Sequence, residues 1–251
     1  MSIESVAGNA MADYFPWAIL PLKPASESNT RLGPVLSPHH RRELYEVMLA
    51  DVLSALTSVP TIGGVLAITS CPVAMSHLRR AGAETLPDPG HGGLNEAVTY
   101  GLAELDRRNI AGAFKIPGDI PVVTSDEITG VIRSIQDNGS VTIVPSPDGQ
   151  GTNSLAMTPP TLLPPRFGHS SKDAHIALAG QKDLYLELMP LLGFGFDIDT
   201  PADLNRMAAL KGPSQTKRFL DEIGFLKRKT QSPTPVPVSY THLTLPTICS
   251  V

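Results

Sequence analysis

Two aspartates separated by one residue, in the stretch GFDIDTP, form the most chemically suggestive pair in the sequence. If this stretch ends a strand, side-chain alternation places Asp197 and Asp199 on one face and turns Ile198 to the other. Neighbouring carboxylates repel each other unless a cation or a proton lies between them. Another aspartate, Asp119, lies in the loop IPGDIP after a separate apolar run. Three carboxylates without a His or Cys partner are typical of a hard cation, so we expect Mg²⁺ or Mn²⁺.

A structural explanation accounts for only one of the acidic residues in this region. Thr200 and Pro201 are typical of a helix N-cap and first turn, and Asp203 is placed to interact favourably with the helix dipole. Asp197 and Asp199 precede this cap and gain nothing from it. An isolated aspartate in a turn, such as Asp119, usually bonds its own backbone, so Asp119 is informative only together with the pair.

Short apolar runs alternate with helical patterns along the chain. The expected strands are 17–22, 63–69, 111–117, 140–146 and 153–158. The expected helices are 39–56 behind a Ser37-Pro38 cap, 72–81, 94–109, 126–138 capped by Thr124 or Ser125, and two that begin near Ser171 and Pro201. This alternation predicts an α/β fold, a single three-layer α/β/α domain with a mostly parallel sheet.

Ligands of open α/β sheets bind beyond the carboxyl ends of the strands, so the loops after strands are the places to look for a site. The loop after the first strand, PLKPASESNTRLGP, carries Lys23 and Arg31, which could bind phosphates. A solvated basic loop is the commoner origin of either residue alone. The turn PSPDGQGTNS offers backbone N–H groups and the Thr152 hydroxyl to an anion.

Composition limits the class of protein, its partners and its cellular location. The chain has 251 residues, 41% of them hydrophobic, with a formal charge of −4, which is typical of a protein that buries a proper core. No cluster of Lys and Arg is visible, so we expect no nucleic-acid partner. Two distant cysteines favour a reducing cytoplasm over a disulfide framework. No apolar run is long enough to span a membrane, and the N-terminal segment does not resemble a signal peptide. Met11 is a candidate for the start of the native chain.

The C-terminal segment differs in kind from the rest. Residues 230–251 are rich in Pro, Thr and Ser, show no period, and follow a basic helix that we expect to end in FLKRK. The portion VSYTHLTLPTICSV looks like a translated vector or adapter tail, and a genuine flexible tail is the alternative. We therefore place the domain at residues 12–229 and exclude 230–251 from it.

Six motifs carry a resemblance to a known family. In order and spacing, LPLKPASESNTRL, GGLNEAV, IPGDIPVVT, DGQGTNSL, RFGHSSKDAH and GFDIDTPADL are similar to motifs of the guanylyltransferases that activate a small phosphorylated acid during biosynthesis of the deazaflavin coenzyme F-420. Members act on 2-phospho-L-lactate, phosphoenolpyruvate or 3-phospho-D-glycerate. The resemblance spans about Trp17 to Leu210 and implies a fold like that of the nucleotide-diphospho-sugar transferases, in agreement with the alternation.

The resemblance also implies roles for individual residues. The metal-binding aspartates of the family fall on Asp119, Asp197 and Asp199, and Asp119 and Lys23 take catalytic positions, with Lys23 at the nucleotide triphosphate. The residues expected around the nucleotide are Lys23, Arg31, Leu94 and Asn95, and those expected around the acceptor phosphate are Thr152, Gly168 and Ser171. His175 occupies a family position but receives no role. Gln150 stands where glycine is common in the family, and Lys172 stands where an aromatic residue is common. These departures leave open which of the three acids is the acceptor.

The implied reaction transfers GMP from GTP to an acceptor phosphate and releases pyrophosphate. The attacking oxygen is already ionised at neutral pH, so the protein must supply alignment and charge neutralisation rather than a general base. Two alternatives stay open, namely a nucleotidyltransferase for a molybdenum-pterin cofactor or sugar phosphate, and a non-catalytic nucleotide-binding protein. The oligomeric state is open between a monomer and a homodimer.

Overall fold

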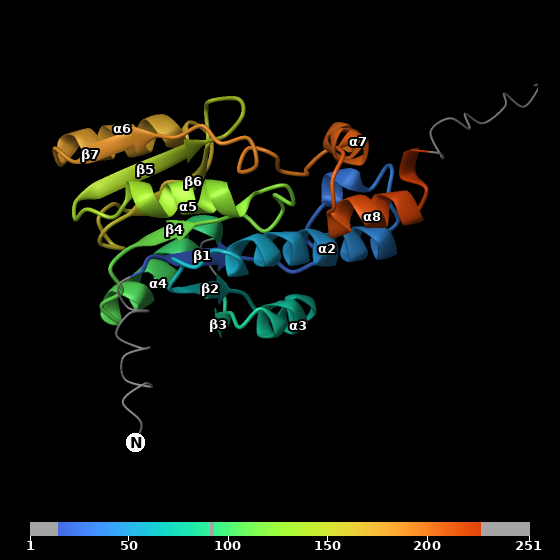
Figure 1. Cartoon of the computed structure of the whole chain (residues 1–251), viewed down its shortest axis with the longest axis horizontal. Coiled ribbons are helices and arrows are strands. Elements are labelled where there is room, and N and C mark those ends of the chain that lie inside the picture. Colours follow the sequence, from blue (N-terminus) through green and yellow to red (C-terminus); the bar gives the residue numbers. More distant parts are fainter. Residues whose placement is uncertain (1–14, 91–92, 227–251) are drawn as a thin grey trace, which may run out of the picture.

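The computed structural model describes residues 15–90 and 93–226, and its centre is one seven-stranded sheet in the order β3-β2-β1-β4-β6-β5-β7 (Figure 1). β6 pairs antiparallel with β4 and β5, whereas the other described pairings are parallel. The strands are β1 (Trp17–Pro21), β2 (Gly64–Ile68), β3 (Glu84–Leu86), β4 (Ala113–Lys115), β5 (Ser140–Pro145), β6 (Thr152–Met157) and β7 (Tyr185–Leu188). The predicted mostly parallel α/β sheet is confirmed.

Helices cover both faces of this sheet and complete the three layers. Side chains of β1 alternate between the faces, with Ala18 and Leu20 in one core cluster and Trp17 and Ile19 in the other. The first face is covered by α2 (Pro38–Thr57), α3 (Pro72–Arg80) and α5 (Ser125–Ser134). The second is covered by α4 (Gly93–Arg107) and α6 (Ser171–Gln181).

Beyond the sheet, α2 carries a third apolar cluster. Leu44 and Met48 on α2 pack against α7 (Pro201–Ala209) and α8 (Gln215–Glu222), and against Phe196 and Ile198 of the segment that precedes α7. Figure 1 shows α7 and α8 beside one end of α2, away from the sheet. This cluster fixes the position of the segment that contains Asp197 and Asp199, because Ile198 is fully buried in it.

The helix starts expected from the sequence are confirmed. The Ser37 side chain accepts a hydrogen bond from the His40 N–H at the start of α2, with Pro38 in the first turn. Thr124 caps α5 in a reciprocal capping box, and Thr200 and Asp203 form another at α7. Each box satisfies N–H groups that a helix end would otherwise leave unpaired.

The structure adds two strands to the expected elements and leaves two C-terminal expectations partly or wholly outside the described residues. α8 stops at Glu222 because Gly224 adopts a left-handed conformation (φ +63°) that ends a helix. Phe225 and Leu226 are helical again, and the remainder of the expected helix end FLKRK, residues 227–229, lies outside the described residues. The short strands β3 and β7 were not expected, because three or four residues show too little alternation to be recognised. The proposed tail 230–251 lies outside the described residues.

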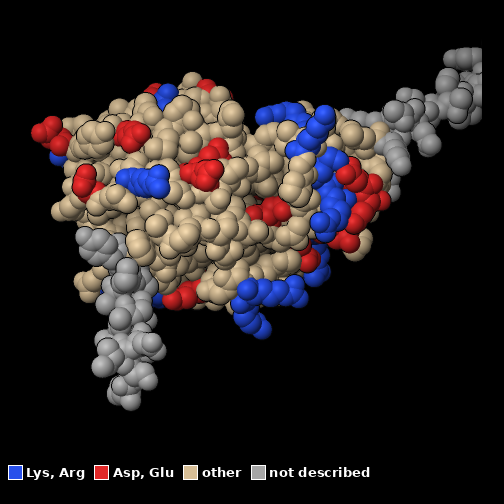
Figure 2. Space-filling view, in the orientation of Figure 1, with Lys and Arg blue, Asp and Glu red and all other residues tan. Residues whose placement is uncertain are grey.

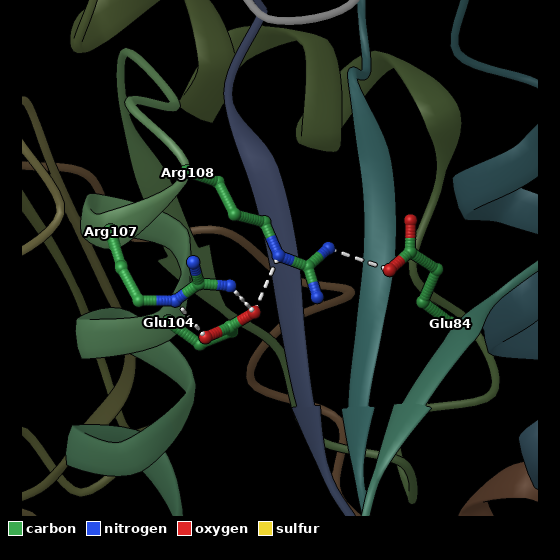
Figure 3. A network of polar contacts seen from close by, with 4 residues as sticks. All are labelled: Glu84, Glu104, Arg107 and Arg108. Atoms are coloured by element: carbon green, nitrogen blue, oxygen red, sulfur yellow. Dashed lines mark hydrogen bonds and ion pairs between the residues drawn. The ribbon is translucent and has the colours of Figure 1, made fainter.

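An ion-pair network ties the β3 edge of the sheet to the end of α4 (Figure 3). Arg108 contacts Glu84 at 2.6 Å and Glu104 at 2.8 Å, and Arg107 contacts Glu104 at 2.9 Å. Hydrogen bonds from Arg107 and Arg108 lower the pKa of Glu104 to about 2. The network uses all four of its charges internally, so we regard it as structural.

Charged side chains are mixed over the face shown in Figure 2. Lys and Arg gather on the side that carries α7 and α8, but Asp and Glu lie among them. Within residues 15–90 and 93–226, none of the helices is both long and apolar enough to cross a bilayer.

The loop before Asp197 depends on a hydrogen bond from α5. Glu127 accepts from the Gly193 N–H at 2.7 Å while its other oxygen accepts from Thr124 N–H at 3.1 Å. A Cβ at Gly193 would overlap the Glu127 side chain and the Val123 backbone, so only glycine fits this close approach.

We therefore expect Glu127→Ala to lower the free energy of unfolding by about 2 kcal/mol, since it removes a capping box and leaves a partly buried N–H unpaired. The measurement is the urea midpoint. Asp126→Ala, at an exposed position in the same first turn, is the control and should change stability by less than about 0.5 kcal/mol. Equal effects of the two variants would contradict the role of Glu127.

Candidate functional site

A pocket of about 470 Å³ lies at the carboxyl ends of β1 and β4. β1 pairs with β2 on one side and β4 on the other, and chain connections diverge at such a point, which is where open α/β sheets bind ligands. The walls come from the loops after β1, β3 and β4, from α2, from the start of α4 and from one residue before α7. A cavity therefore lies beyond the strand ends, where the sequence placed the search for a site.

The structure brings half of the expected site residues to this pocket. Its lining includes Lys23, Arg31, Leu94, Asp119 and Asp199. Leu94, 37% exposed, presents apolar surface at the start of α4. The other expected residues do not line it: Asn95, Asp197, Thr152, Gly168 and Ser171.

The aspartate pair does not end a strand. Residues 196–199 run without regular secondary structure toward α7, and the alternation arises from burial of Ile198. The Ile198 N–H donates to the Asp119 carbonyl at 3.1 Å, which pins this segment beside the loop after β4. Asp197 and Asp199 flank the pinned residue, so this backbone contact brings the segment that carries them beside the loop that carries Asp119.

Two of the acidic groups at this edge, Asp119 and Asp197, have raised pKa values. Burial, together with Asp199 and Asp197 and opposed by Lys115, raises the pKa of Asp119 to about 6. Burial, Asp199 and Asp203 also raise the pKa of Asp197. Burial is the main cause of both shifts, and the neighbouring carboxylates add to it.

The carboxylates nevertheless do not form a closed cage. Over the described part of the chain, no group of three or more Asp, Glu, His or Cys side chains is arranged to hold a metal ion. Arg31 instead contacts Asp199 at 3.3 Å, with both side chains largely exposed. This exposed pair is weak, so Asp199 can exchange Arg31 for another cation at little cost.

These residues fit a hard divalent cation by their chemistry. The donors would be carboxylate oxygens from Asp119, Asp197 and Asp199, and burial together with the neighbouring carboxylates raises the pKa of the first two. Mg²⁺ and Mn²⁺ prefer such ligands and keep positions for water and phosphate oxygens.

Asn95 has a structural use that its sequence position did not reveal. Its amide nitrogen donates to the Phe167 carbonyl at 2.9 Å, and its amide oxygen accepts from the Phe167 N–H at 2.7 Å. Both ends of the side chain are thus engaged in holding the segment 164–168 against α4. The expected contact between Asn95 and a nucleotide stays a prediction.

The residues expected at the acceptor phosphate meet at the N-terminus of α6. The Arg166 N–H donates to His175 Nε2 at 2.9 Å, so the proton of the neutral ring lies on Nδ1, which is 3.0 Å from the Thr152 hydroxyl. Burial lowers the pKa of His175 to about 4, so the ring stays neutral. His175 therefore positions Thr152 and leaves the hydroxyl proton free to donate elsewhere.

Ser171 and Gly168 complete this second group. The Ser171 hydroxyl is fully buried and has no hydrogen-bond partner among the described residues. Gly168 has φ +136°, a conformation that other residues avoid. The Gln150 carbonyl accepts from the Lys172 N–H at 3.2 Å, so the two positions that depart from the family pattern meet through backbone atoms.

Sequence reasoning missed two buried residues that line the pocket. Tyr45 donates to the Lys23 carbonyl at 3.2 Å and so fixes the first loop. Lys115 is 7% exposed at the end of β4. Lysine in the apolar run AFKI is rare in a buried strand, and this signal was present in the sequence.

The raised pKa of Asp119 yields a prediction for metal-free protein. The pKa of Asp119 in the folded protein is about 6, above the ordinary value of 3.8. The protonated carboxyl group therefore contributes to the free energy of unfolding below pH 4, and this contribution is lost as the pH rises through 6. In chelator, Asp119→Asn should match wild type near pH 4 and exceed it at pH 7 by about 1–2 kcal/mol, since the carboxylate is partly open to the pocket.

Thermal midpoints measured from pH 4 to pH 8 test this expectation. Asp106→Asn, at an exposed helical position, is the control and should follow wild type throughout. An Asp119→Asn protein that is less stable than wild type at pH 7 would show that the carboxylate is structural.

Comparisons with known proteins identify the family of this chain. The family model described as "Guanylyl transferase CofC like" matches residues 17–239, which extends into the segment proposed as a tail. The phosphoenolpyruvate guanylyltransferase of Sphaerobacter thermophilus is 35% identical over 191 residues, 76% of this chain and 91% of that protein. The enzyme of the same name from Conexibacter woesei is 32% identical over 213 residues, 82% of this chain and 96% of that protein.

Solved structures support the fold alone. A proposed nucleotide-diphospho-sugar transferase from Desulfovibrio desulfuricans G20 has a TM-score of 0.70 at 16% identity, covering 85% of this chain and 97% of that one. A nucleotidyl transferase from Methanothermobacter thermautotroptrophicus has a TM-score of 0.58 at 14% identity, covering 83% and 99%. Because the family model matches residues 17–239, which is most of this chain, the chain belongs to the CofC-like guanylyl transferases.

Proposed function

We propose that this guanylyltransferase transfers GMP from GTP to the phosphate of phosphoenolpyruvate in the biosynthesis of coenzyme F-420. The observation that carries the proposal is the placement of Lys23, Asp119 and Asp199 around one pocket at the switch point of the sheet. The names of the curated relatives support phosphoenolpyruvate over the other two acids.

In this reaction an acceptor phosphate oxygen attacks the α-phosphorus of GTP. A new P–O bond forms, the bond to the β-phosphate oxygen breaks, and pyrophosphate leaves with the electron pair. The nucleophile is an anion at neutral pH, so no residue needs to remove a proton. The protein contributes alignment and neutralisation of negative charge.

The nucleotide is assigned to the pocket beside β1. Lys23 and Arg31 in the loop after β1 supply cationic groups for the triphosphate, and Leu94 supplies apolar surface for the base. Asp88 lines the same pocket, and a carboxylate accepts from the adjacent N1–H and N2–H donors of guanine. This arrangement favours guanine over adenine, which has no such donor pair.

The acceptor phosphate is assigned to the N-terminus of α6. The Thr152 hydroxyl is oriented by His175, and the Ser171 hydroxyl is buried without a partner, so both can donate to phosphate oxygens. Gly168 allows the backbone to approach closely, since it carries no Cβ.

Asp119, Asp197 and Asp199 are assigned to Mg²⁺ or Mn²⁺. When bound, such an ion supplies neutralisation of the phosphate charges that accumulate in the transition state. The cytoplasmic location, the absence of a nucleic-acid partner and the choice between monomer and homodimer stay predictions of the sequence.

The assignment of the acceptor is tested by pyrophosphate release from purified enzyme with GTP and Mg²⁺. Each of phosphoenolpyruvate, 3-phospho-D-glycerate and 2-phospho-L-lactate is offered separately. We expect phosphoenolpyruvate to give the highest kcat/KM. Preference for another acid would replace the acceptor, and release with none would contradict the proposed function.

Variants of the acceptor residues provide a sharper test. Thr152→Val and Ser171→Ala should each raise the KM for the acid about 10- to 100-fold and leave the KM for GTP nearly unchanged, since a hydrogen bond to a charged group contributes about 1.5–3 kcal/mol. Thr129→Val, in α5, is the control because its hydroxyl bonds only a helix carbonyl. An equal rise in both KM values would refute the assignment.

Variants of the aspartate pair test the metal assignment through stability. Mg²⁺ and GTP at a hundredfold excess over Kd should stabilise wild type by about 2.7 kcal/mol, and Asp197→Asn or Asp199→Asn should lose much of this gain. In chelator the same variants should be as stable as wild type or more so, because like-charge repulsion is relieved. If they unfold in chelator or keep near-normal transfer with Mg²⁺, the metal assignment is wrong.

A further inference from the structure

Lys115 is the least expected charged residue in the molecule. It ends β4 in the centre of the sheet, paired with Ile19 of β1, and its side chain is 7% exposed. Burying an ammonium group is costly unless it is paired with a charge and fully hydrogen-bonded. A leucine or methionine would fill this position without that cost, so the charge needs an explanation.

The contacts of Lys115 within the protein do not explain why a charged residue is buried at this position. Among the described residues its Nζ makes one hydrogen bond, to the Asn153 carbonyl at 3.1 Å, and forms no ion pair within 4.0 Å. The ammonium lies 5.1 Å from the centre of the Phe167 ring. An ammonium group has three donors, so two are not used by these contacts.

The charge is nevertheless retained near neutral pH. Burial lowers the pKa of Lys115 to about 8, and the more distant charges of Asp119 and Asp197 oppose this shift. The group is therefore largely protonated at pH 7. A buried cation held close to a pocket with unused donors is suited to bind an anion.

The position of Lys115 relates it to both halves of the site. It lines the pocket assigned to GTP, together with Asp119 and Leu94. Its hydrogen-bond partner Asn153 adjoins Thr152, and Phe167, under its ammonium group, adjoins Gly168. Lys115 thus lies between the nucleotide pocket and the residues assigned to the acceptor.

We propose that Lys115 is a catalytic residue that contacts the α-phosphate of the nucleotide at the point where the acceptor phosphate attacks it. This assignment rests on the proposed guanylyl transfer for the identity of the second phosphate. During attack, negative charge accumulates on the oxygens of the α-phosphorus as one P–O bond forms and the other breaks. An ammonium already fixed by Asn153 and Phe167 stabilises that charge without reorganisation.

A purely structural role predicts different behaviour. If Lys115 served only to bond Asn153, its loss would destabilise the fold and leave nucleotide binding unaltered. If it binds the α-phosphate, Lys115→Met removes an incompletely compensated buried charge and should leave the thermal midpoint within a few degrees of wild type. The readout must therefore separate phosphate binding from folding.

The first measurement compares the binding of GMP and guanosine by calorimetry. Wild type should bind GMP more tightly than guanosine because of the α-phosphate. Lys115→Met should weaken GMP binding about 10- to 100-fold, as expected for a charged hydrogen bond, and leave guanosine binding unchanged. Lys182→Met is the matched control, since the Lys182 Nζ also donates to one carbonyl, that of Leu162 at 2.8 Å, but is exposed at the far end of α6.

The second measurement is guanylyl transfer with GTP, Mg²⁺ and each of the three acids. Lys115→Met should lower kcat about 100- to 1000-fold, and Lys115→Arg should restore part of it because the charge returns. Lys115→Gln, which keeps a donor for the Asn153 carbonyl but carries no charge, replaces Lys115→Met if the methionine variant does not fold. It should show the same losses.

The outcomes separate the two proposals. If wild type transfers to none of the acids, the proposed function fails, and the GMP measurement still decides the role of Lys115. Loss of the GMP preference in Lys115→Met but not in Lys182→Met supports the role. A GMP preference unchanged in both neutral variants, or turnover within about threefold of wild type, overturns it.

Discussion

One backbone hydrogen bond, from the Ile198 N–H to the Asp119 carbonyl, holds the aspartate pair beside the loop that carries Asp119. It joins the loop after β4 to the segment before α7, two parts of the chain that are otherwise held by different cores. Ile198 itself is buried in the cluster around α2, so the bond is locked by apolar packing from one side. The residues on either side of Ile198 are the two aspartates. Their proximity to Asp119 follows from this contact together with the packing of the Ile198 side chain.

The concentration of carboxylates sets a second constraint, which is the balance of charge at this edge. Asp119 and Asp197 both have raised pKa values, and the cations within reach are Lys115 and Arg31. Neither neutralises the group fully, because Arg31 forms only an exposed pair and Lys115 acts at longer range. A fold that keeps charges of both signs partly buried and incompletely paired loses stability, and this loss is typical of sites that bind charged ligands. Under the proposed function, the divalent cation would offset the charge of the carboxylates, and the phosphate groups of the two substrates would offset the charge of the cationic side chains.

Much of the fold was predictable because its signals are local. The caps at Ser37, Thr124 and Thr200 follow from side chains that bond N–H groups three residues away, and the apolar runs of β1, β2 and β5 contain enough alternation or length to be recognised. Elements without such signals were missed. β3 and β7 are too short to show a period.

The sequence by itself determined the family, the α/β class and the residue types of the site, because the motifs keep their order and their chemistry in any conformation. Tertiary structure decided which of those residues share a pocket. It directed the Asn95 amide to the Phe167 backbone, placed His175 behind Thr152, and set Lys115 between two groups of site residues. These contacts join residues tens of positions apart, and no local pattern encodes them. Their physical origin is the packing of helices on both faces of the sheet, which brings strand ends and helix starts to one edge.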